Sequence, residues 1–162
     1  MEPDWEALVR AGMEQVGPEA TLAYFAELHT RYPDSARANF ELAGVLDSQG
    51  PEGAAIPYYE RAISLGGLSR DLHAYGLIQL GSSLRNVGRA EEAVTLLTEA
   101  ERRFPEQWAG SLFLALALHS AGRAEEALAT VMRATLKHGR ENSLTRYRRA
   151  LTEYIDDIRP SF

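Results

Sequence analysis

Apolar side chains recur three and four residues apart along most of the chain, the spacing that places them on one face of an α-helix. Leucines four residues apart show the pattern most clearly: Leu42 with Leu46, Leu80 with Leu84, and Leu114 with Leu118. Glycine and proline interrupt the pattern, as at Gly17-Pro18 and Tyr32-Pro33, where helices are expected to begin or end. The chain is predicted to be all-α, with about nine helices joined by turns and no β-sheet.

A six-residue segment occurs twice in the chain. Gly-Arg-Ala-Glu-Glu-Ala at 88–93 returns letter for letter at 122–127, and 122 minus 88 is 34. The flanking residues agree in kind at the same offset, as Leu97 does with Val131 and Ala100 with Ala134. A fixed period of this length is the signature of stacked helix pairs.

The period divides the chain into four units and a final helix. A degenerate unit covers about 2–35, the next units cover 36–69, 74–107 and 108–141, and a capping helix follows at about 141–158. Four residues are added near 66–73; the preferred interpretation is that Ser69 caps a helix one turn longer, and a functional loop is the alternative. Pro57, early in a second helix, is expected to remove one backbone hydrogen bond and to kink that helix mildly.

These motifs resemble those of the tetratricopeptide repeat family. The resemblance rests on Leu-Gly or Leu-Ala at 80–81 and 114–115, on the glycines and alanines of the repeated hexapeptide, and on Pro105. It implies a right-handed α-solenoid of stacked antiparallel helix pairs, and a binding scaffold rather than an enzyme. Small residues such as Ala43, Gly81 and Ala115 then allow paired helices to approach to roughly 8–10 Å. The paired glutamates of the hexapeptide are interpreted as solvated helix starts.

In the family, the face of each first helix opposite the core lines a concave groove, so we expect the partner-binding residues there. A step of about 100° per residue selects the positions on this face. They are Arg37, Phe40, Gly44 and Asp47; then Tyr75, Ile78, Ser82 and Arg85; then Ala109, Leu112, Leu116 and His119. The expected surface is an apolar strip, with Arg37 and Arg85 available to orient an acidic group.

The run from Leu112 to Leu118 is apolar around the whole helix, and such a helix is normally buried all round. A stack covers only part of it, so Leu112, Phe113 and Leu116 are expected to face the groove unless the capping helix covers them. Two functions remain open. The favoured one is binding of a peptide or helix from another protein, and the alternative is a homodimer formed through the same groove or through an end of the stack.

Composition narrows the remaining classes. The chain has 162 residues, a net charge of -6, 45% hydrophobic residues and no cysteine. These values predict a soluble, cytoplasmic single domain that binds neither nucleic acid nor membrane. The four histidines, His29, His73, His119 and His138, lie in different units, and no phosphate loop or nucleophile motif occurs. We therefore expect no catalytic residues, no cofactor and no metal.

Overall fold

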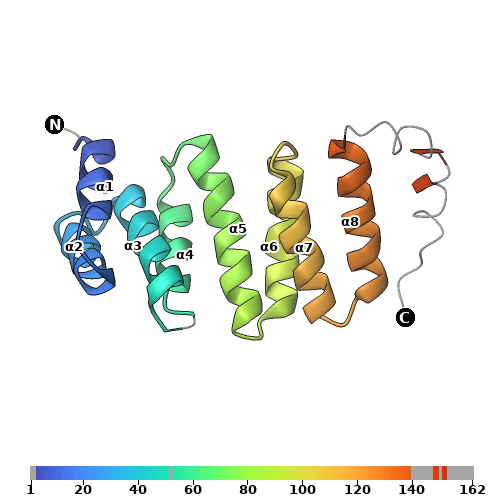
Figure 1. Ribbon diagram of the computed structural model, residues 1–162, viewed down its shortest axis with the longest axis horizontal. Helices are drawn as coiled ribbons and strands as arrows, with labels where there is room; N and C mark the ends of the chain where they lie inside the picture. The colour runs from blue at the N-terminus through green and yellow to red at the C-terminus, as the bar shows by residue number, and fades with distance from the viewer. Residues whose placement is uncertain (1–2, 52, 140–147, 150, 153–162) are drawn as a thin grey trace. The chain divides into compact units, whose positions relative to one another are not determined.

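The computed structural model describes residues 3–51, 53–139, 148, 149, 151 and 152. These residues contain eight long helices and no strand, as the spacing predicts (Figure 1). The helices are α1 (Trp5–Met13), α2 (Pro18–Arg31), α3 (Ala36–Gln49), α4 (Ile56–Leu65), α5 (Arg70–Asn86), α6 (Ala90–Arg103), α7 (Trp108–Ser120) and α8 (Ala124–His138). No helix in this described part is long and apolar enough to cross a membrane. The chain packs as two compact units, 1–83 and 84–162.

Three helices that begin in the first unit, α1, α3 and α5, begin where the sequence places capping side chains. Asp4 accepts a hydrogen bond from the Ala7 amide at 3.1 Å, and Ser35 accepts one from the Ala38 amide at 3.3 Å. Ser69 accepts one from the Leu72 amide at 3.3 Å, immediately before α5, which has 17 residues. The lengthened, serine-capped helix is therefore confirmed.

Pro57 does not interrupt its helix. α4 begins at Ile56, so Pro57 occupies the first turn, where backbone N–H groups have no partner within the helix. The expectation that Pro57 removes a hydrogen bond from a helix interior, and so causes a kink, is wrong. The helix starts later than the family pattern suggests, because Gly53 has a φ of 81° and the turn before α4 extends to Ala55.

The core of the first unit forms where consecutive helices pack together. Phe25, Leu28, Leu42 and Val45 form a buried cluster between α2 and α3. α1 approaches so closely that a Cβ atom on Gly12 would lie 2.4 Å from Cζ of Phe25. The small residue at position 12 is thus required by packing.

α5 packs on both helices of the preceding pair within the first unit. A Cβ atom on Gly76 would meet the Phe40 ring of α3 at 3.6 Å and Cγ1 of Ile63 in α4 at 3.8 Å. Seven residues further along α5, the Ser83 hydroxyl donates a hydrogen bond to Oδ1 of Asp47 at 2.6 Å. A first helix therefore covers the groove between the two helices that precede it.

In the second unit, the repeated hexapeptide produces the same turn twice. Gly88 and Gly122 have φ values of 83° and 77°, a left-handed conformation that glycine adopts without strain. The amides that follow, of Arg89 and Arg123, donate to the carbonyls of Leu84 and Leu118, each at 2.9 Å, and so close the preceding helix.

Both arginines of the hexapeptide then bind the glutamate three residues on. Arg89 donates from Nε and Nη2 to the Glu92 carboxylate, each at 2.7 Å, and Arg123 binds Glu126 in the same way at 2.6 and 2.8 Å. These hydrogen bonds lower the pKa of both carboxyls. The pairs lie in the first turn of α6 and α8, on the exterior of the repeats.

α6 packs against α7, and α7 packs against α8. Leu97 and Ala100 of α6 are buried, as are Leu114 and Leu118 of α7. The Ser111 hydroxyl of α7 donates a hydrogen bond to Oε1 of Glu101 at 2.5 Å. The leucines and alanines that the repeat pattern assigns to the core are therefore in it.

The expected capping helix at 141–158 lies mostly outside the described residues and stays a prediction. Of its described residues, 148, 149, 151 and 152 are helical. Leu151 packs on a cluster formed by Ala129 and Leu136, which Met132 also contacts. Arg148 donates hydrogen bonds to the carbonyl oxygen of Leu136 and, at 3.5 Å, to that of Gly139.

Candidate binding groove

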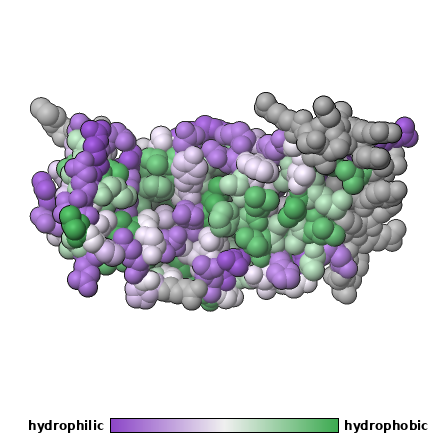
Figure 2. Space-filling model, viewed as in Figure 1, coloured by the Kyte–Doolittle hydropathy of each residue, from purple (hydrophilic) through white to green (hydrophobic). Residues whose placement is uncertain are grey.

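The second unit has an open apolar groove of about 470 Å³. It is formed by α7, through Leu112, Ala115, Leu116 and His119, and by α8, through Ala124, Ala127, Leu128 and Val131. Figure 2 shows hydrophobic side chains gathered on the face over these helices. We call this feature the α7–α8 groove.

Two side chains of the α8 wall are exposed although their counterparts in the two preceding repeats are buried. Leu128 and Val131 are 54% and 37% exposed. Exactly 34 residues earlier, Val94 and Leu97 are 6% and 0% exposed, and 38 residues before those, Ile56 and Tyr59 are 7% and 1% exposed. The same helix face is therefore closed in two repeats and open in the last one.

The cause of the difference is visible in the first unit. Phe40 and Asp47 of α3 occupy the same repeat positions as Leu112 and His119 of α7. Adding the two repeat spacings, 38 and 34, to 40 and to 47 gives 112 and 119. Phe40 packs edge-to-face on Tyr59 with ring centroids 6.0 Å apart, and α5 lies against it through Gly76. Asp47 is bonded to α5 as well. Among the described residues of the second unit, no following first helix packs on the corresponding side chains of α7.

Three of the residues selected from the sequence line the groove. Leu112 and Leu116 are 38% and 46% exposed, and His119 is exposed at one end of the groove. Phe113, which the same reasoning directed at a partner, is half-buried and does not line the groove. The apolar circumference of α7 is thus divided between core and groove.

Other selected residues lie elsewhere. Ile78 is buried, so the expectation that it faces an open groove is wrong. Phe40 is half-buried and packed between helices, as described above. Tyr75 is 49% exposed, and Ser82 is half-buried. For Phe40 the physical reason is that α5 packs on the face of α3 opposite that helix's own core.

The two arginines expected to orient an acidic partner already have protein partners. Arg37 Nε donates to Oε1 of Glu41 at 2.5 Å, and Nη1 lies 3.1 Å from Oε1 of Glu6. Arg85 is half-buried, and its Nη2 donates to Oδ1 of Asn86 at 2.6 Å. Arg37 therefore compensates a buried carboxylate rather than standing available for a ligand.

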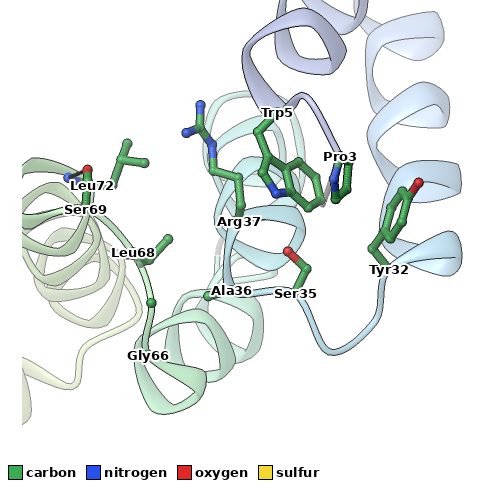
Figure 3. A pocket seen from close by; sticks show the side chains of 11 residues that line it. Pro3, Trp5, Tyr32, Ser35, Ala36, Arg37, Gly66, Leu68, Ser69 and Leu72 are labelled. Atoms are coloured by element: carbon green, nitrogen blue, oxygen red, sulfur yellow. Dashed lines mark hydrogen bonds between the residues drawn. The ribbon is translucent and has the colours of Figure 1, made fainter. Parts of the chain in front are cut away.

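Arg37 also borders a second cavity, of about 400 Å³, in the first unit. Pro3, Trp5 and Tyr32 lie on one side of it, Leu68, Ser69 and Leu72 lie on the other, and Arg37 stands between them (Figure 3). Trp5 and Tyr32 pack edge-to-face, with ring centroids 5.5 Å apart. Because the guanidinium is engaged by Glu6 and Glu41, this cavity has no free charge to hold an anion.

Sequence reasoning missed Leu128 and Val131, which supply the α8 wall. It assigned binding to first helices only, whereas the groove needs a first and a second helix. Comparison at the offset of 34 gives a usable signal: Leu128 and Val131 match Val94 and Leu97, and the repeated hexapeptide does not return a third time after them. An apolar position in the last copy of a repeat has no next copy to cover it.

The chemistry of the groove is that of a binding surface. Its lining side chains are aliphatic apart from His119. In the part of the chain that the structure describes, no group of three His, Asp or Glu residues is placed to hold a metal ion. The arrangement is suited to burying apolar side chains.

These observations define an α-helical repeat protein in which α5 closes the α3–α4 pair while the α7–α8 pair has an open groove. The sequence profile described as Tetratrico peptide repeat matches residues 36–158. The chain therefore belongs to the tetratricopeptide repeat family, as its motifs indicated, and the family supports a role as a scaffold for protein–protein interaction.

The fold is also that of several solved structures. The crystal structure of MamA protein superposes with a TM-score of 0.70 at 21% identity, covering 89% of this chain and 76% of that chain. A MamA fragment from Desulfovibrio magneticus RS-1 gives 0.64 at 15% identity, covering 95% and 90%. A mutant of the Thermobaculum terrenum O-GlcNAc transferase gives 0.67 at 21% identity over 85% of this chain but 28% of that one. No curated protein matches the chain in sequence.

Proposed function

We propose that this chain is a non-enzymatic interaction scaffold that binds a peptide or helix of another protein in the α7–α8 groove. The observation that supports the proposal is the exposure of Leu128 and Val131 at positions that are buried in the two preceding repeats. Burial of apolar surface contributes about 25 cal/mol per Å², so an open surface of this kind favours association. A groove lined by leucine and valine selects a partner with apolar side chains.

Selection from a displayed library of short random peptides tests the proposal. Peptides retained by the wild-type chain should bind the Leu116→Ala and Leu128→Ala variants more weakly by about 1–3 kcal/mol each, because central apolar anchors carry most of an interface's energy. Fluorescence anisotropy with labelled peptides measures the affinities. The matched control is Glu92→Ala, since Glu92 is exposed and bound by Arg89 outside the groove.

Two results would count against partner binding in this groove. If no selected peptide distinguishes the wild type from the leucine variants, the groove is not the binding site. If sedimentation shows a dimer that Leu116→Ala converts to monomer, the groove is filled by a second copy of the chain, and the scaffold is a self-associating one.

A further inference from the structure

We infer that the occupant of the α7–α8 groove is a helix of another protein, and that it docks as the next first helix of the repeat would. This inference rests on the proposed function and specifies the partner. Helix packing within the molecule provides the template for this docking: α5 closes the α3–α4 pair, and α7 packs on α6. The α7–α8 groove continues that repeat interface by one step.

The template defines what the partner helix must carry. Gly76 of α5 lies over Phe40, and Gly110 of α7 stands at the same repeat position, since 110 minus 76 is 34. A small residue is therefore expected over Leu112, which matches Phe40. Seven residues later, Ser83 bonds to Asp47, the counterpart of His119. The partner helix is expected to present a hydroxyl or carboxylate to His119, two helical turns after its small residue.

The described C-terminal residues that contact α8 do so away from the groove. Leu151 packs on the cluster of Ala129 and Leu136, neither of which lines the groove. Arg148 binds carbonyl oxygens at the C-terminal end of the same helix. These described residues leave Leu128 exposed, so the groove and the C-terminal contact are separate.

This second face of α8 is a specialisation of the last repeat. At the corresponding positions α6 has Thr95, Thr98 and Arg102, and α4 has Pro57, Glu60 and Ser64, all of them exposed. Only in α8 are the three positions apolar: Ala129, Met132 and Leu136. The apolar residues at these positions accompany the contact of Leu151 with the Ala129 and Leu136 cluster, which supports this face, and not the groove, as the place where Leu151 packs.

A second copy of the chain is a poor occupant. α1 is the first of the described helices. If two copies stacked head to tail, α1 of one copy would therefore lie in the groove of the other. Asp4, the N-cap residue immediately before α1, stands at the repeat position of Gly76, because 4 plus 34 plus 38 is 76. Stacking would bring the Asp4 carboxylate, which caps α1, against Leu112, and moving a charge from water into an apolar contact is unfavourable. A helix from another protein, with a small neutral residue there, has no such cost.

A single engineered thiol tests the inference, because the natural chain has no cysteine. In the full chain at low concentration, Leu128→Cys should react with a thiol reagent at least about tenfold faster than the matched variant Val94→Cys, since buried thiols react only after local opening. Circular dichroism verifies that both variants fold. The probe is a helix-stabilised synthetic peptide of residues 70–86, the α5 sequence, which should slow the reaction of Leu128→Cys.

Peptide variants then separate helix docking from other occupants. With Leu80→Pro the peptide should lose roughly a hundredfold in affinity, because proline breaks the helix, and Gly76→Leu should weaken it by overpacking. If the proline peptide protects equally well, or neither peptide protects, helix docking is wrong, while groove-dependent selected peptides would still uphold the proposed function. Slow reaction of Leu128→Cys at all concentrations would assign the groove to the chain's own C-terminal segment. If the thiol of Leu128→Cys is protected only at high concentration of the chain, the groove is occupied by a second copy. Either of these two results would overturn the inference.

Discussion

Arg37 and Glu41 form an ion pair one helical turn apart on α3, with Arg37 Nε 2.5 Å from Glu41 Oε1 and only 9% of the Glu41 side chain exposed. Burial raises the pKa of Glu41, and the hydrogen bond and charge of Arg37 offset this only in part. The carboxyl therefore holds its proton more tightly in the folded chain than in the unfolded one. Its contribution to stability is complete below its ordinary pKa of 4.5 and is lost as the pH rises through the raised value.

Glu41→Gln should consequently change the pH dependence of stability. The free energy of unfolding of the wild type, measured relative to this variant by urea titration, should fall as the pH rises from 4.5 through the raised pKa. Arg37→Ala should show the same fall more steeply, because it leaves the buried carboxylate without its cation. Identical pH profiles for wild type and Glu41→Gln would show that Glu41 is not perturbed by folding.

Gly12→Ala should destabilise the chain by about 1–3 kcal/mol, because the added methyl group overlaps the Phe25 and Tyr24 rings. Gly44→Ala is the matched control on α3, where the nearest atom, the Tyr59 hydroxyl oxygen, lies 3.9 Å away. That variant should be neutral or more stable by up to about 1 kcal/mol, since alanine favours helix. Thermal unfolding of both variants measures the difference, and equal effects would mean that α1 is not packed on α2 as described.

Leu97→Ala and Val131→Ala compare one repeat position in its closed and open forms. Leu97 is fully buried, so its truncation should cost about 2–5 kcal/mol in the free energy of unfolding. Val131 is 37% exposed, so its truncation should cost less than about 1 kcal/mol. Chemical denaturation measures both values. A large loss for Val131→Ala would show that the groove is closed in solution.

Ser111→Ala should remove the hydrogen bond to Glu101 that joins α7 to α6. Because the Ser111 side chain is buried, we expect a loss of about 1 kcal/mol in the free energy of unfolding. Ser120→Ala, at the exposed end of the same helix, serves as the control and should change stability by less than about 0.5 kcal/mol. Indistinguishable melting curves for the two variants would show that the Ser111–Glu101 bond contributes nothing measurable.

Family, helix positions and repeat spacing were all available from the sequence, because each depends on local signals. The hexapeptide at 88–93 and 122–127 carries its own turn, cap and ion pair, so identical letters give identical local structure. Ser69 likewise marks the start of α5 through a bond to an amide three residues away. Such features involve neighbours along the chain, and tertiary contacts do not change them.

The exposure of each helix face was not available in the same way. Ile78 and Leu112 occupy the same repeat position and both are aliphatic, yet one is buried and the other exposed. Arg37 reads as a free cation in the sequence, and only the fold brings Glu6 to it from α1. Side-chain type and helical period are equal at such positions, so they cannot distinguish an interface between repeats from a surface for a partner.

The sequence by itself determined that this protein is a stack of helix pairs with a 34-residue period and an apolar α7. Only the tertiary structure decided that, in the described part of the second unit, Leu116 of α7 and Leu128 of α8 wall an open groove. The physical reason is that burial depends on which helix packs over a residue. That neighbour is set by the stacking of the repeats and not by the residue's own position in its helix.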